Sequence, residues 1–153
     1  MPDLKSLLAP VSCKVATLDL TDTDAAETAL AEAFPADGET VRDIEIAARA
    51  GLAGGTLCDR ENAGVRFSRI AKPDADPGGC SIDAVYMADS PGPIHTHTKG
   101  EVCLCFADGG EPAFEGRRET WMVLPPGSRH APTVTEGKML IIYWWPDGAV
   151  AWK

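Results

Sequence analysis

The chain is poor in basic residues, and this shortage excludes several classes of partner. Its 153 residues include 14 Lys and Arg against 23 Asp and Glu, which gives a formal net charge of −9. A surface of this sign repels nucleic-acid phosphates and anionic membranes, so we expect neither as a partner. No pair of basic helices of the kind that binds DNA is evident in the sequence.

Long apolar runs and paired cysteines are also missing. No apolar stretch approaches the length of a membrane span, and the N-terminus lacks the apolar segment of a signal peptide. The five cysteines are scattered along the chain without a CxxC pair. We therefore expect reduced thiols in a cytoplasmic protein rather than a disulfide framework.

The composition that remains is sufficient for one globular domain. Hydrophobic residues make up 44% of the chain, a value typical of folded rather than disordered proteins. Residues 1–55 are rich in helix formers and predict a helical segment. We expect a short leading helix around Leu4–Leu8, a second over 25–34 that stops at Pro35, and a third from about 37 to the glycines at 54–55.

Residues 56–153 show a different pattern, with short β-type runs separated by Gly, Pro and Asp. The predicted strands cover 64–71, 80–87, 101–106, 119–124 and 138–145, with turns at 76–79, 108–110, 115–116 and 146–148. Strands at this spacing without intervening helices favour an antiparallel sandwich or barrel. The last run is apolar on both faces, so we expect the helices or a second subunit to cover one of them.

All three histidines fall in two short segments. His95 and His97 are two apart on an extended segment and should point to one face of a sheet. A turn at 98–100 precedes Glu101, and the Pro-Pro-Gly turn at 125–127 precedes His130. Three imidazoles and one carboxylate could therefore converge. Such a donor set suits Mn, Fe, Co, Ni or Zn, and the sequence does not choose among them.

These segments resemble the two signatures of the cupins: Gly92…His95-Thr-His97…Glu101…Gly109, and Pro125-Pro126-Gly127-Ser-Arg-His130. The resemblance implies a mainly β fold, a cupin-like antiparallel β-barrel of the jelly-roll or double-stranded β-helix type, with the N-terminal helices packed on it. It also implies that His95, His97, Glu101 and His130 hold one divalent transition metal. Barrels with long apolar strands commonly pair, so a homodimer is expected.

The chain is similar, more particularly, to the 4-hydroxylaminobenzoate lyases. The similarity includes the N-terminal helices and the segments 65–73, 95–101, 124–134 and 145–150. It implies a metal-dependent lyase of aromatic compound degradation that converts an aryl hydroxylamine to a catechol and releases ammonia. A divalent metal could polarise the hydroxylamine oxygen or lower the pKa of a bound water.

Other residues are candidates for roles around such a metal. Glu101 and Tyr86 could move protons. Arg69 could hold a substrate carboxylate through two parallel hydrogen bonds if it points inward. Trp121 and Tyr143 could form walls of an aromatic pocket.

Several residues have a structural interpretation beside a functional one. Cys103 and Cys105 share a strand face with Glu101 and could approach the metal, although buried cysteine commonly fills a small core position. We expect Trp144, Trp145 and Trp152 to pack against the helices or a partner chain, because exposed aromatic surface is a liability.

Three other functions stay open. Iron in a His/Glu site also binds dioxygen, so a dioxygenase would present the same ligand residues. The fold could instead serve as a non-catalytic binding protein for a small molecule, or as a dimerisation module. Oxygen dependence, ligand binding without metal, and metal content distinguish these alternatives from the lyase.

Overall fold

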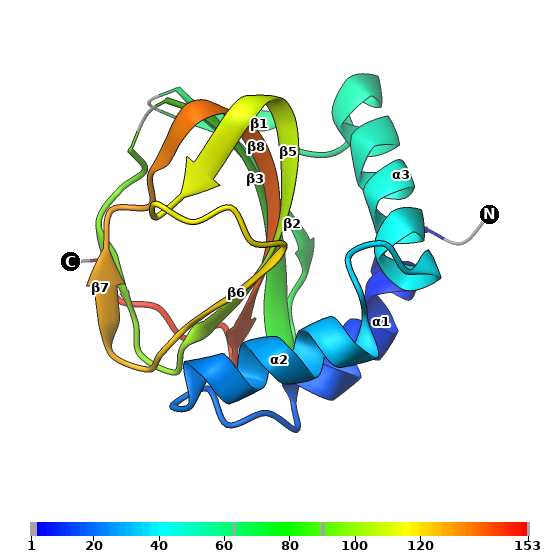
Figure 1. Ribbon diagram of the computed structural model, residues 1–153, viewed down its shortest axis with the longest axis vertical. Helices are drawn as coiled ribbons and strands as arrows, with labels where there is room; N and C mark the ends of the chain where they lie inside the picture. The colour runs from blue at the N-terminus through cyan, green and yellow to red at the C-terminus, as the bar shows by residue number, and fades with distance from the viewer. Residues whose placement is uncertain (1–2, 63, 90, 153) are drawn as a thin grey trace.

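Three helices open the chain in a computed structural model, which describes residues 3–62, 64–89 and 91–152 (Figure 1). The carboxylates of Asp3 and Asp22 cap the first two helices by accepting hydrogen bonds from backbone N–H groups of their first turns. The third helix ends at Gly55, whose φ of 76° is the left-handed conformation that glycine adopts without strain. The bounds are α1 (Leu4–Val15), α2 (Thr23–Ala33) and α3 (Glu39–Gly54).

The rest of the described chain is mainly β-structure. A six-stranded antiparallel sheet has the order β1-β2-β3-β8-β5-β6, and a separate two-stranded sheet pairs β4 with β7. A 3-10 turn at Pro73–Ala75 joins β2 to β3. The strands are β1 (Arg60–Asn62), β2 (Val65–Ala71), β3 (Cys80–Ala88), β4 (His95–His97), β5 (Glu101–Phe114), β6 (Trp121–Leu124), β7 (Ser128–His130) and β8 (Val134–Pro146).

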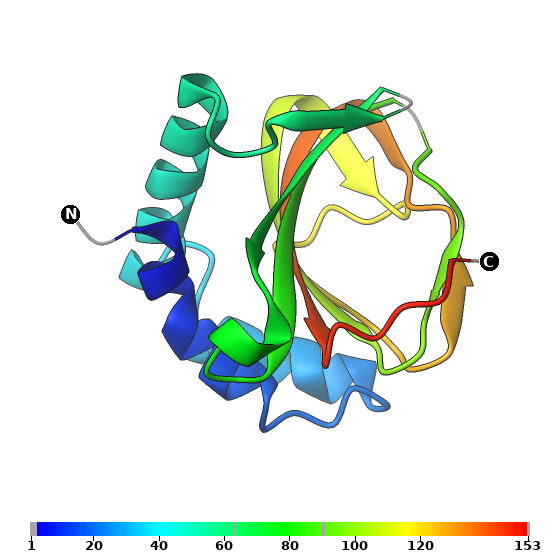
Figure 2. The same ribbon diagram turned by 180° about the vertical axis from the view of Figure 1, so that it is seen from behind.

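The arrangement is that of a cupin-type fold with N-terminal helices, as the sequence predicts. Figures 1 and 2 show the helices on one side of the curved large sheet and the β4–β7 pair on the other. Among the described strands, the two sheets face each other without closing into one hydrogen-bonded barrel.

Strand β8 lies between β3 and β5 and is buried on both faces. Its helix-facing side chains, Leu140, Ile142 and Trp144, belong to a core shared with α1, α2 and α3. Trp144 is fully buried and donates a hydrogen bond from Nε1 to Ser12 of α1 at 3.0 Å. The helices therefore cover one face of β8, which was one of the two alternatives, and the other face is free to line a site.

The expected turn at 108–110 was wrong, because β5 continues through it to Phe114. Its pairing with β8 shifts register on both sides of Gly110, whose φ is 74°. A Cβ atom at Gly110 would lie 2.6 Å from the carbonyl oxygen of Glu136, so the two backbones approach too closely for a side chain. The glycines thus mark a bulge in a long strand rather than its end.

None of the described helices is both long and apolar enough to cross a membrane.

Candidate metal centre

Two turns bring the histidine segments together. The turn after β4 is closed by the N–H of Gly100, which donates to the carbonyl of His97 at 3.2 Å. In the turn before β7, the N–H of Gly127 donates to the same carbonyl at 2.7 Å. Gly100 and Gly127 both have positive φ, at 91° and 83°, which explains why glycine stands at each position. These bonds hold β4 against β7, with His95 directly opposite His130.

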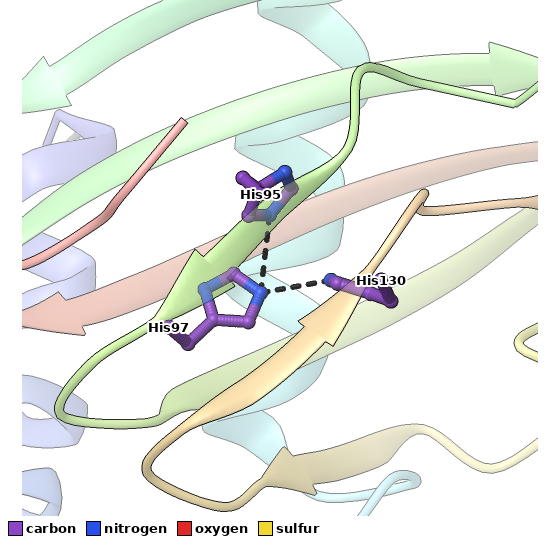
Figure 3. A group of neighbouring side chains, drawn as sticks. All are labelled: His95, His97 and His130. Atoms are coloured by element: carbon purple, nitrogen blue, oxygen red, sulfur yellow. Dashed lines mark hydrogen bonds between the residues drawn. The ribbon is translucent and has the colours of Figure 1, made fainter. Parts of the chain in front are cut away.

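The three imidazoles meet through their Nε2 atoms. The Nε2 of His97 lies 3.1 Å from that of His95 and 2.8 Å from that of His130 (Figure 3). One nitrogen from each ring therefore lies within 4.8 Å of the other two, a spacing at which all three could bind one ion. The predicted convergence of His95, His97 and His130 is confirmed.

The outer nitrogens determine which atoms face the centre. The Nδ1 of His95 lies 2.8 Å from the carbonyl oxygen of Pro93, which only accepts hydrogen bonds. The Nδ1 of His130 lies 3.4 Å from a carboxylate oxygen of Glu115. His95 thus carries its proton on Nδ1 and directs an Nε2 lone pair inward. The Nδ1 of His130 is buried without a hydrogen bond among the described residues, and an Nδ1–H facing Glu115 would likewise turn the Nε2 lone pair of His130 inward. An N–H at the Nε2 of His97 can donate a hydrogen bond to only one of these lone pairs at a time. A cation between the rings would instead accept a lone pair from each of the three Nε2 atoms.

Burial keeps His97 and His95 in the neutral form that binds metals. His97 is fully buried, and burial together with the two neighbouring histidines lowers its pKa to about 3. Burial also lowers the pKa of His95. The donor set fits a borderline divalent metal, because neutral imidazole nitrogens are its usual ligands.

Glu101 lies beside the histidines but outside the group of three. Its Oε2 is 3.5 Å from the Nε2 of His97 and accepts a hydrogen bond from the indole of Trp145. Its Oε1 accepts a hydrogen bond from the thiol of Cys103 at 3.0 Å. Burial raises the pKa of this carboxyl, although both hydrogen bonds oppose the shift. Its role as a fourth ligand stays a prediction.

A pocket of about 430 Å³ opens between the two sheets, and two of the three histidines, His95 and His130, line it. His95, Glu101 and His130 contribute to its polar end. The hydroxyl of Tyr143 makes no hydrogen bond within the described residues, and its side chain lines the pocket. The remaining wall is mainly apolar and includes Val65, Phe67, Val85, Met87, Phe114 and Ile141. The volume and the apolar wall suit one small aromatic molecule.

Two other candidate residues lie on the helix side of the large sheet, away from the pocket. Tyr86 points to the helix side, where its hydroxyl donates to Asp108 at 2.6 Å. Trp121 is buried on the same side and donates to the carbonyl of Phe34 at 2.9 Å. Neither residue lines the pocket, so the catalytic role of Tyr86 and the substrate-binding role of Trp121 are not supported by their positions.

Arg69 and the two cysteines occupy intermediate positions. Arg69 shares the inner face of the sheet but forms an ion pair with Asp83 at 2.9 Å and does not line the pocket. Cys103 and Cys105 belong to the same apolar cluster, but only Cys103, next to Glu101, lines the pocket. Cys103 is therefore the cysteine that approaches the site.

Sequence reasoning missed three residues around the histidines. Trp145 and Trp152 line the pocket instead of packing on the helices, with ring centroids 5.7 Å and 5.2 Å from that of His95. Their expected contact with a partner chain stays a prediction. Glu115 contacts His130 from the turn after β5. The alternation of β8 would have placed Trp145 and Trp144 on opposite faces, but no local pattern indicates Trp152 or Glu115.

The facing antiparallel sheets, the N-terminal helices and the three converging histidines define a cupin-type protein with a possible metal site. Within that class, the chain belongs to the PnbB family, described as 4-hydroxylaminobenzoate lyase, which it matches over residues 9–152.

Individual relatives are more distant. The chain is 28% identical to 4-hydroxylaminobenzoate lyase from Pseudomonas putida over 141 residues, covering 80% of each protein. Among solved structures, it is similar to the DMSP lyase DddQ from Ruegeria pomeroyi, at 23% identity and a TM-score of 0.43, over 82% of this chain and 75% of that one. It is also similar to an RmlC-like cupin from Shewanella frigidimarina, at 14% identity and a TM-score of 0.40, over 57% of this chain and 80% of that one.

Proposed function

We propose that the protein is a metal-dependent lyase that converts an aryl hydroxylamine to a catechol and ammonia. The observation that carries the proposal is the convergence of three imidazole Nε2 atoms beside an apolar pocket, which His95 and His130 line. The family and the Pseudomonas putida relative supply the reaction class. At 28% identity, the particular substrate of this chain is part of the proposal.

The reaction balances without an external oxidant or reductant. One water enters, the N–O bond breaks, and two ring carbons end with hydroxyl groups while nitrogen leaves as ammonia. The ring loses the two electrons that the nitrogen gains. The site therefore has to hold the ring, deliver water and move protons, but it does not have to store electrons.

His95, His97 and His130 would hold the metal, which would polarise the hydroxylamine oxygen or lower the pKa of a bound water. The apolar wall would hold the ring and exclude bulk water from it. The hydroxyl of Tyr143 is free to donate a hydrogen bond to the hydroxylamine group, since no described residue accepts it. Tyr143 is thus the phenol we propose for substrate binding.

Glu101 has two proposed roles, which one substitution separates. Its raised pKa favours a protonated carboxyl that can supply a proton to the departing nitrogen or oxygen. Alternatively, its oxygen near His97 serves as the fourth metal ligand. Glu101→Gln should abolish turnover in both cases, but only loss of a ligand should also lower the metal content of the purified protein.

Arg69 is the proposed partner of a substrate carboxylate. No Lys or Arg is found among the described residues that line the pocket, and Arg69 lies on the same sheet face as Phe67 and Asp83. A carboxylate would have to compete with Asp83 for its guanidinium. Arg69→Gln should raise KM for 4-hydroxylaminobenzoate and leave KM for hydroxylaminobenzene unchanged; equal effects on both substrates would remove this role.

The reaction is tested by incubating the metal-loaded protein with 4-hydroxylaminobenzoate and measuring ammonia and the catechol product, 3,4-dihydroxybenzoate. The proposal expects both products in equal amounts, under nitrogen as well as in air. Product formation that stops under nitrogen would favour a dioxygenase, and no ammonia above a protein-free control would refute the lyase. An inactive His97→Ala variant would tie the activity to the metal site.

We also propose that the protein works in the cytoplasm as a homodimer. Light scattering of the eluted protein would give about twice the chain mass of 16.2 kDa for a dimer. A mass of one chain would refute the dimer without affecting the metal site.

A further inference from the structure

Trp152 is an exposed tryptophan at the edge of the pocket. Its exposed fraction is 60%, the highest among the large hydrophobic side chains that are exposed in the described chain. An aromatic side chain of this size is usually buried, and one that stays exposed commonly contacts a partner or a ligand. Trp152 nevertheless lines the pocket, so part of its ring faces the cavity while part faces solvent.

The backbone fixes this position. After β8, the chain turns at Asp147, whose N–H donates to the carbonyl of Gly79, and then runs back beside β4. Thr96 and Ala151 exchange both of their backbone hydrogen bonds, at 2.7 Å and 2.9 Å. Main-chain pairing, rather than the preference of the side chain, therefore determines which residues lie beside Trp152.

The register of that pairing aligns Trp152 with the histidines. With Thr96 opposite Ala151 in an antiparallel bridge, residue 152 lies opposite His95, and His95 lies opposite His130 on the other side of β4. Directly opposed residues project to the same face of a sheet. Trp152, His95 and His130 thus form one row, which explains the 5.2 Å between the ring centroids of Trp152 and His95.

A second tryptophan lies on the inner side of this row. The ring of Trp145 is 6.1 Å from that of Trp152 and 5.7 Å from that of His95. Trp145 is buried, and its indole nitrogen is already committed to Glu101. Trp145 is therefore a fixed wall, whereas the exposed face of Trp152 has room for a contact that the protein itself does not make.

From this geometry we infer that Trp152 is a specificity-determining residue, which packs against the ring of a bound aromatic ligand beside the histidines. The inference rests on the proposed function for the identity of the reaction, but the contact itself depends only on the ligand ring. A flat aromatic ring gains the contact, and a saturated ring of similar size gains less, because aromatic pairs add attraction beyond the buried area.

The inference is tested by binding rather than turnover. The probe is benzoate, which keeps the ring and the carboxylate and lacks the N–O bond, and the saturated control is cyclohexanecarboxylate, which carries the same charge. Calorimetric titration of the metal-loaded protein should show that Trp152→Ala lowers the affinity for the aromatic probe by about 2- to 10-fold. The affinity of Trp152→Phe should stay close to that of the wild type. Affinity for the saturated control should change by less than about 2-fold.

Control measurements separate this role from simple damage. Ile46→Ala removes another exposed hydrophobic side chain, 50% exposed on α3, and should leave binding unchanged. Metal content should be equal in all variants. Unchanged affinity of Trp152→Ala for the aromatic probe, or equal weakening of both probes, would overturn the inference. A protein that binds the probe through Trp152 yet releases no ammonia would refute the proposed reaction alone.

Discussion

Glu115→Ala should weaken metal binding without removing any proposed ligand. Glu115 begins the turn after β5, where its Oε1 accepts a hydrogen bond from the N–H of Thr133 at 2.8 Å and its Oε2 faces the Nδ1 of His130 at 3.4 Å. Burial opposes ionisation of this carboxyl, but the contacts with His130 and Thr133 keep its pKa below the usual value. An ionised Glu115 is therefore placed to attract a proton to the Nδ1 of His130, which would direct the Nε2 lone pair of His130 toward a bound metal.

The expected magnitude follows from the contact distances. Removing a carboxylate that orients a metal-binding histidine typically costs about 10- to 100-fold in affinity. Because 3.4 Å is longer than an ordinary hydrogen bond, we expect the lower part of that range, about 10-fold or 1.4 kcal/mol. Loss of the Thr133 contact should separately reduce the free energy of unfolding by about 1 kcal/mol.

Competition with a coloured chelator measures the metal affinity, and thermal unfolding of the metal-free protein measures stability. Glu115→Gln keeps an acceptor for Thr133 and should recover most of the stability but less of the affinity. The matched control is Glu119→Gln, a 54%-exposed carboxylate paired with Arg117, which should change neither quantity. Wild-type metal affinity in Glu115→Ala would refute the orienting role and the tautomer assigned to His130.

Three further predictions concern the site and the core. Tyr143→Phe should lower kcat/KM in the ammonia assay by at least about 10-fold, since a hydrogen bond to substrate is lost, whereas Tyr86→Phe on the helix face should leave it within about 2-fold; equal effects would contradict the face assignment. In the metal-free protein, His97 has its pKa lowered to about 3, so its contribution to stability is present above the unfolded value of 6.5 and is lost as pH falls toward 3. Thermal unfolding at several pH values should show this loss. A His97→Gln variant should have a weaker dependence of stability on pH in this range. Trp144→Ala should reduce the free energy of unfolding by about 3–5 kcal/mol, because the side chain is fully buried between sheet and helices; denaturant titration showing a loss below about 1 kcal/mol would contradict its place in the core.

Local sequence patterns predicted most of the elements and the histidine cluster. The stop at Pro35 and the glycines at 54–55 predicted the bounds of α2 and α3 within a few residues, whereas α1 runs on to Val15, beyond the expected Leu4–Leu8. Two glycine-containing turns beside His97 and His130 were enough to predict that the histidines converge. These signals are local, because the turn chemistry is written in adjacent residues.

Local patterns could not predict which side chains of each strand point to the pocket and which point to the helices. Strand β8 is apolar on both faces, since helices cover one side and the other side belongs to a second apolar cluster that lines the pocket. Alternation of polar and apolar residues therefore gave no direction, and Tyr86 could not be distinguished from Tyr143. Trp152 and Glu115 reach the site through pairings with distant segments, which short-range patterns do not encode.

Elemental analysis of the purified chain, beside His95→Ala and His130→Ala, tests the central claim most directly. The account predicts about one transition metal per wild-type chain, and its loss from both variants while circular dichroism shows them folded. A wild-type chain that takes up no metal when supplied with Mn, Fe, Co, Ni or Zn, or variants that retain it, would contradict a metal centre formed by these histidines.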